Sequence, residues 1–200
     1  MNRLSALLKA NEQWANKTKK DDLDKFDRLS ADQKPKYLWI GCSDSRILPN
    51  ELCQLGPGEL FVHRNIANQV VQNDTNCLSV LQYAVDVLKV TDVIICGHYG
   101  CGGVQASLTQ DTTGPIDNWL DHIRKIYADH SNEFAAIKNK DEEIKLLTEL
   151  NIKQQVSNLS NTKTIKDAWN KSQEVYIHGL VYSLKSGLLN DLNVSLGPNN

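Results

Sequence analysis

Apolar residues occur along this chain in short continuous runs, each bounded by turn-forming residues. Runs at residues 37–40 (YLWI), 60–62 and 93–96 (VIIC) predict buried strands, the second after a turn signal at residues 56–58 (GPG). Residues 76–90 are apolar on more than one side and predict a largely buried helix, with Asp74, Thr75 and Asn76 as candidate caps. This order of strand, helix and strand predicts a parallel sheet covered on both faces.

The flanking segments predict mostly helices. Apolar residues at helical spacing predict an N-terminal helix, and its Trp14 needs cover from a core or from a partner subunit. Further helices are predicted at roughly 116–130, 141–159 and 162–170, and residues 174–189 predict a strand that leads into a turn at Ser186-Gly187. We therefore expect one α/β domain over residues 1–200, with an N-terminal arm of about residues 1–34.

Composition limits the partners of this chain of 200 residues. A formal net charge of −2 gives no reason to expect a nucleic acid or an anionic membrane as partner. No apolar run approaches the ~20 residues that span a bilayer, and the first residues lack a signal-peptide core. We expect a cytoplasmic protein, in which five cysteines are reduced thiols or metal ligands rather than a disulfide framework.

Metal-ligand side chains follow two of the predicted strands. Cys42 and Asp44 come directly after the first strand, and His98 and Cys101 come after the strand at 93–96. Ligands of open parallel sheets bind beyond the carboxyl ends of the strands, so we expect these side chains to converge. Two thiolates and an imidazole suit zinc, which they bind tetrahedrally, and one position is left for water or a carboxylate.

Asp44 is the candidate for that fourth position. Arg46 and the metal then compete for the Asp44 carboxylate. A guanidinium two residues away can hold a carboxylate through two parallel hydrogen bonds. Bound to zinc, Asp44 closes the site, whereas an Asp44 held by Arg46 leaves the metal open to water. The purely structural alternative is that Cys42 is a small buried hydrophobe and that the His-x-x-Cys spacing carries no metal. The Arg46 guanidinium is the feature that a structural site does not need.

Three segments in this order, CSDSR (42–46), GELFVHRNIAN (58–68) and CGHYGCGG (96–103), resemble those of the beta-class carbonic anhydrases. The resemblance is specific from about Gln33 to Ala106, is weaker through the later helices, and returns at HGLVYSLKSG (178–187). It implies a bacterial-type enzyme with a central, mostly parallel β-sheet flanked by helices, and an N-terminal helical arm that packs on a partner subunit of a homodimer or homotetramer.

The resemblance also implies roles for individual residues. Cys42, His98 and Cys101 correspond to the zinc ligands, Asp44 and Arg46 to a gating dyad, and Gln33 to a residue that reaches into the partner's active site. The implied reaction is the reversible hydration of carbon dioxide to bicarbonate and a proton by zinc-bound hydroxide. In it Asp44 orients the nucleophile, and the backbone N–H of Gly102 binds the developing oxyanion.

A subtype of the family has a second bicarbonate site that allosterically favours the state with Asp on zinc. Trp39, Arg64 and Tyr182 match its positions, although a core strand residue, an interface ion pair and a strand aromatic are the structural alternatives for them. The segment SRILPNE departs from the family, because its proline, Pro49, falls one place later than in much of the family. The balance of the Asp44 switch is therefore expected to differ.

Two other functions stay open on the same residues. One is a zinc hydrolase of a sulfur analogue, carbonyl sulfide or carbon disulfide, with the same metal site and a different pocket. The other is a non-catalytic module that zinc stabilises, which leaves the pair of Asp44 and Arg46 without a purpose. The reaction rate distinguishes the three, whereas zinc content does not.

Overall fold

A computed structural model describes residues 3–109 and 111–198 of the chain, which divides into two compact units at Lys34 and Pro35. The first unit holds two helices, α1 (Ser5–Asp21) and α2 (Lys25–Ala31). The rings of Trp14 and Phe26 meet edge to face at 5.6 Å, but neither helix has a buried residue. The predicted N-terminal helix is present, and its apolar side chains stay largely exposed within this chain.

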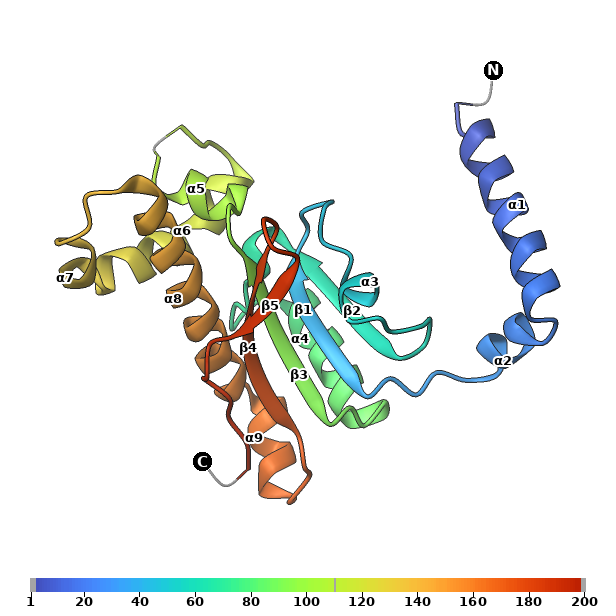
Figure 1. Cartoon of the computed structure of the whole chain (residues 1–200). Helices are drawn as coiled ribbons and strands as arrows, with labels where there is room; N and C mark the ends of the chain where they lie inside the picture. Colours follow the sequence, from blue (N-terminus) through green and yellow to red (C-terminus); the bar gives the residue numbers. More distant parts are fainter. Residues whose placement is uncertain (1–2, 110, 199–200) are drawn as a thin grey trace. The chain divides into compact units, whose positions relative to one another are not determined.

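The second unit is built on one five-stranded sheet (Figure 1). Its strands are β1 (Tyr37–Cys42), β2 (Leu60–Asn65), β3 (Asp92–His98), β4 (Tyr176–Ser183) and β5 (Leu188–Asp191), in the order β2-β1-β3-β4-β5. The first four are parallel, which confirms the predicted fold class. β5 pairs antiparallel with β4 through the turn at Gly187, whose φ of 73° suits glycine.

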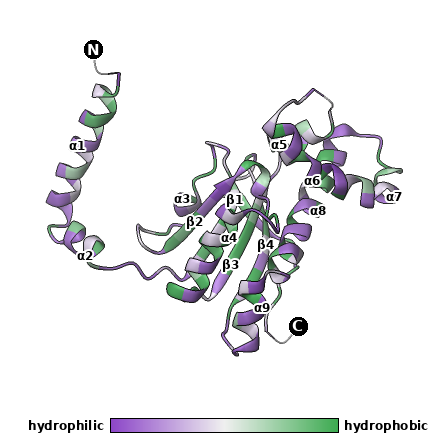
Figure 2. Cartoon of the chain, turned by 180° about the vertical axis from the view of Figure 1, so that it is seen from behind, coloured by the Kyte–Doolittle hydropathy of each residue, from purple (hydrophilic) through white to green (hydrophobic). Residues whose placement is uncertain are grey.

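One face of the sheet is covered by three long helical segments (Figure 2). These are α4 (Thr75–Gln82), which continues as the π-helix η2 (Tyr83–Val87), α8 (Lys140–Ser160) and α9 (Lys163–Asn170). Alternate strand residues such as Leu38, Ile40 and Ile95 pack with these helices into the main apolar core. Asp74 caps α4 as predicted, because its side chain accepts a hydrogen bond from the N–H of Asn76.

The opposite face has thinner cover than the sequence predicts. In the described part of the second unit, the connection between β1 and β2 contributes only the short helix α3 (Pro49–Leu52) and turns. Residues 53–59, which include the Gly56-Pro57-Gly58 turn, connect α3 to β2 without a further helix. Trp39 and Tyr182 nevertheless pack there in a small cluster with Ile47.

The remaining elements lie beyond the carboxyl ends of β1 and β3. They are η1 (Ile66–Asn68), α5 (Gly102–Ser107), α6 (Pro115–Asp129) and α7 (Ser131–Phe134). α5, α6 and α8 pack around a second apolar cluster, which includes Cys42, Ala67 and Cys101. Among the described residues, no helix is long and apolar enough to cross a membrane.

Candidate metal centre

The strand order places the predicted ligands at a switch point of the sheet. The chain leaves β1 toward β2 on one side, and β3 pairs with β1 on the other side. The carboxyl ends of β1 and β3 thus meet at the position where open α/β sheets bind ligands. Cys42 is the last residue of β1, His98 is the last residue of β3, and Cys101 directly precedes α5.

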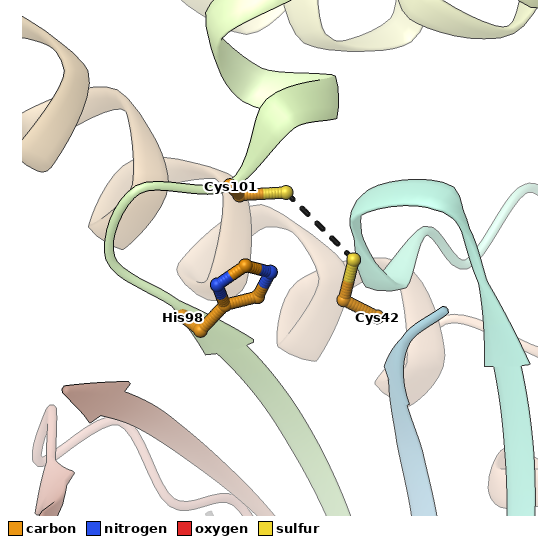
Figure 3. Close-up of side chains that lie close together, drawn as sticks. All are labelled: Cys42, His98 and Cys101. Atoms are coloured by element: carbon orange, nitrogen blue, oxygen red, sulfur yellow. Dashed lines mark hydrogen bonds between the residues drawn. The ribbon is translucent and has the colours of Figure 1, made fainter. Parts of the chain in front are cut away.

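Three of the predicted residues converge beyond these strand ends (Figure 3). The Sγ atoms of Cys42 and Cys101 are 3.8 Å apart, and each lies within 4.8 Å of a ring nitrogen of His98. All three residues are buried. The Nε2 atom of His98 has no hydrogen-bond partner among the described residues, although buried polar atoms normally have one.

The donor set fits a zinc ion. The Sγ atoms of Cys42 and Cys101 share a hydrogen bond in which either atom can donate. This bond, and after it His98 and the backbone N–H groups of Ala67 and Asp44, lower the pKa of Cys42 to about 4. The same S–H bond and burial raise the pKa of Cys101. One thiolate is thus stabilised before any metal binds, and a divalent cation can replace the shared proton.

Asp44 lies beside this cluster but is turned toward Arg46. Its Oδ1 accepts hydrogen bonds from the Nε (2.9 Å) and the backbone N–H (3.0 Å) of Arg46, and its Oδ2 accepts one from Nη2 at 2.6 Å. Oδ2 is 3.7 Å from Nε2 of His98. The bond to the Arg46 side chain holds the pKa of the Asp44 carboxyl well below its usual range, so Asp44 is ionised at neutral pH.

The other predicted site residues are placed differently. Trp39, Arg64 and Tyr182 point to the same face of the sheet by strand register, and Trp39 is fully buried. Arg64 donates from Nε to the carbonyl oxygen of Cys42 and from Nη2 to that of Asp44. Gly102 begins α5.

Gln33 belongs to the first unit, so its position relative to the metal centre is not determined.

Two contributors to the site were not foreseen from the sequence. Ala67 supplies an N–H to Cys42 from a left-handed backbone conformation with φ of 62°. The carbonyl oxygen of Tyr99 lies 3.2 Å from Nδ1 of His98, and the Tyr99 hydroxyl donates to Glu149 at 2.6 Å. Ala67 and Tyr99 both act on the cluster through backbone atoms, so their side-chain types do not signal these roles. The partner of the Tyr99 hydroxyl, Glu149, is 50 residues away in the sequence.

The chain is similar to known carbonic anhydrases. A family model described as carbonic anhydrase matches residues 37–189. A carbonic anhydrase of Emericella nidulans is 43% identical over 94% of this chain and 82% of its own length.

Solved structures give the same result. The beta-carbonic anhydrase of Coccomyxa, in complex with acetazolamide, has a TM-score of 0.92 and 35% identity over 98% of this chain and 89% of its own. One of two tetrameric beta-carbonic anhydrases from Sordaria macrospora has a TM-score of 0.92 and 33% identity over 98% of this chain and 100% of its own.

Proposed function

The chain belongs to the beta-class carbonic anhydrases, and we propose that it hydrates carbon dioxide reversibly to bicarbonate and a proton at the cluster of Cys42, His98 and Cys101. The observation that carries the proposal is the convergence of two sulfur atoms and an unpartnered imidazole nitrogen at the switch point of the sheet. The assignment to a bacterial type and the cytoplasmic location stay predictions.

The three residues of the cluster hold zinc in this proposal. Zinc bound there supplies a Lewis acid that makes hydroxide available near neutral pH. His98 donates its Nδ1–H to the Tyr99 carbonyl oxygen, which leaves Nε2 free as a ligand atom. Two thiolates donate more charge than imidazoles do, so we expect hydration to increase from neutral to alkaline pH.

Asp44 and Arg46 act as gate and latch. While Arg46 holds Asp44 through two parallel hydrogen bonds, the carboxylate stays off the metal and can accept a hydrogen bond from the attacking nucleophile. Released from Arg46, the Asp44 carboxylate would be free to bind a metal held by the three residues and so to close the site. The backbone N–H of Gly102 binds the negative charge that develops on the substrate oxygen.

Bicarbonate regulates this gate at Trp39, Arg64 and Tyr182. The Nε1 atom of Trp39 is buried and has no hydrogen-bond partner in the described part of the chain. Its N–H could therefore donate to a bound anion. An anion that draws Arg64 away from the carbonyl oxygen of Asp44 frees the loop that carries the gate. We expect preincubation with bicarbonate to inhibit the wild type and to have no effect on Tyr182→Phe; equal inhibition of both would assign these residues to structure alone.

Stopped-flow hydration tests the reaction itself. Zinc-loaded protein is expected to hydrate carbon dioxide rapidly, and removal of zinc by a chelator to abolish the rate until zinc is restored. The Cys42→Ser variant is expected to lose the activity together with the metal. Carbonyl sulfide and carbon disulfide are assayed in parallel, because turnover of these compounds without hydration of carbon dioxide would replace the proposal by the sulfur-analogue hydrolase. A zinc-loaded protein with none of these activities would favour the non-catalytic module.

A further inference from the structure

A second group of metal-ligating side chains lies where β2 faces the start of α4. His63 comes from β2, Asp74 is the N-cap residue of α4, and Cys77 is in the first turn of that helix. One ring nitrogen, one carboxylate oxygen and Sγ of these residues all lie within 4.8 Å of one another. None of the three is a ligand of the candidate metal centre.

The three side chains surround a common point without bonding to each other. Among the described residues, no hydrogen bond or ion pair joins any two of them, and Cys77 Sγ, which is fully buried, makes no hydrogen bond at all. Asp74 uses Oδ1 to accept the Asn76 N–H, and the amide nitrogen of Asn65 lies 3.4 Å from Nε2 of His63, near the outer limit of a hydrogen bond. Buried polar groups normally bond directly or through a bridging species.

The spacing leaves room for a cation. Three atoms no more than 4.8 Å apart all lie within about 2.8 Å of a common point, so the side chains need to close by no more than roughly 0.5 to 0.8 Å to reach the Zn–N and Zn–S lengths of about 2.0–2.3 Å. Burial lowers the pKa of His63 and raises the pKa of Cys77 to about 12. Without a cation, burial therefore favours the neutral forms of both groups.

We propose that His63, Asp74 and Cys77 bind a second zinc ion, which joins β2 to α4. One thiolate and one carboxylate balance the charge of the ion, and the imidazole completes a sulfur, nitrogen and oxygen set that suits zinc. On binding, Cys77 forms the Zn–S bond and releases its proton to solvent, while Asp74 binds as the carboxylate. Asp74 is the most exposed of the three and gives the ion its way in.

The bound ion would stiffen β2, the strand that carries Arg64 and thereby supports residues 42–44. His63 directly precedes Arg64, whose guanidinium holds the carbonyl oxygens of Cys42 and Asp44. The second zinc ion therefore has a structural role, and its binding does not depend on the proposed function.

The test counts metal ions in the purified full chain. After zinc loading and gel filtration, the wild type is expected to retain two zinc ions per chain, and Asp74→Asn one. Asparagine caps helices as well as aspartate does, so this variant keeps the start of α4 while it loses a charged ligand. Titration calorimetry is expected to show that the second site is weakened by about 10- to 100-fold or more. Cobalt substitution adds a readout, because thiolate-to-cobalt absorption should increase with the second equivalent in the wild type but not in Cys77→Ser.

The number of zinc ions per chain also defines the control and the results that would refute the proposal. Cys53→Ser, which alters a half-buried thiol outside the cluster, is expected to keep both ions. The proposal is overturned if the wild type holds one zinc ion, or if Asp74→Asn keeps the second ion at unchanged affinity. If Cys77→Ser does not fold, the result for Asp74→Asn alone decides. An inactive protein with two zinc ions would retain this site and refute the proposed function, whereas an active protein with one zinc would do the reverse.

Discussion

At the scale of single residues, Tyr99 links His98, a proposed metal ligand, to the helix α8. Its carbonyl oxygen accepts from His98, its N–H donates to the carbonyl oxygen of Tyr182, and its hydroxyl donates to Glu149 at 2.6 Å. Burial, followed by the hydrogen bond to Glu149 and its negative charge, raises the pKa of the Tyr99 hydroxyl. The backbone carbonyl oxygen of Tyr99 therefore orients His98, and the neutral phenol of Tyr99 anchors that residue to α8.

Stability at alkaline pH should reveal this phenol. The unfolded chain releases the Tyr99 proton near pH 10, whereas the folded chain keeps it, so the stabilisation is complete below about pH 10 and is lost as pH rises toward the folded pKa. Between about pH 10 and 11 we expect the wild type to lose about 1 kcal/mol more free energy of unfolding than Tyr99→Phe. Urea unfolding followed by tryptophan fluorescence measures the difference. Tyr83→Phe, at an exposed tyrosine, should follow the wild type; an identical pH dependence in Tyr99→Phe would contradict the account.

The cluster of Cys42, His98 and Cys101 was predictable residue by residue because its members follow strands that end at one edge of a parallel sheet. That rule, together with the metal-binding chemistry of thiolates and imidazoles, was enough to predict that Cys42 and His98 lie together. The Asp44–Arg46 hydrogen bonds followed from the spacing of two residues. The group of His63, Asp74 and Cys77 was not foreseen, because only the packing of α4 on β2 brings a strand residue to a helix start.

At the scale of elements, α8 holds the segment after β2 through buried amides. Gln155 accepts the Val70 N–H at 2.9 Å and donates to Asn151 at 2.9 Å, and Asn151 donates to the Ala67 carbonyl oxygen at 3.0 Å. Gln69 joins the same network. This network fixes the turn in which Ala67 directs its N–H at Cys42, so a polar stripe of α8 supports the metal centre.

Two adjacent glutamines of α8 test the network. Gln155→Leu leaves the Val70 N–H without its partner and is expected to lower the free energy of unfolding by about 1–3 kcal/mol. Gln154→Leu, on the exposed side of the same turn, is expected to change it by less than about 0.5 kcal/mol. Equal effects in chemical denaturation would show that the buried amides do not hold the segment.

The elements themselves were largely predictable, and their exceptions have local causes. The strands and long helices follow from continuous apolar runs and helical spacing. β5 was missed because its four residues, LLND, are too short and too exposed to show an alternating pattern. The π-helical turn η2, in which the N–H of Leu88 reaches the carbonyl oxygen of Tyr83, depends on packing that no residue pattern marks.

At the scale of the whole molecule, the first unit has apolar side chains with little to cover them inside one chain. Leu7, Leu8 and Trp14 of α1 are all more than half exposed, at 64%, 54% and 53%. Solved relatives include tetrameric beta-carbonic anhydrases. We therefore propose that α1 packs on a second copy of this chain, which would cover these side chains.

Light scattering measures this association directly. The wild type is expected to have the mass of a dimer or tetramer, and Leu7→Ser combined with Leu8→Ser to shift the mass toward the monomer at micromolar concentration. Lys9→Ser on the same helix serves as the control and should keep the wild-type mass. A monomeric wild type, or a double variant with unchanged mass, would show that α1 is not the interface.

In the proposed mechanism Arg46 keeps Asp44 off the metal, and the pH profile of carbon dioxide hydration tests this role. Arg46→Lys preserves the charge but lacks the planar fork that holds both carboxylate oxygens. We expect the zinc-loaded variant to keep its metal, to lose at least about tenfold in rate at neutral pH, equivalent to about 1.4 kcal/mol in the barrier, and to recover toward alkaline pH, where hydroxide competes better with Asp44. A variant with the wild-type rate and pH profile would contradict the gate and leave Arg46 as a surface partner of Asp44.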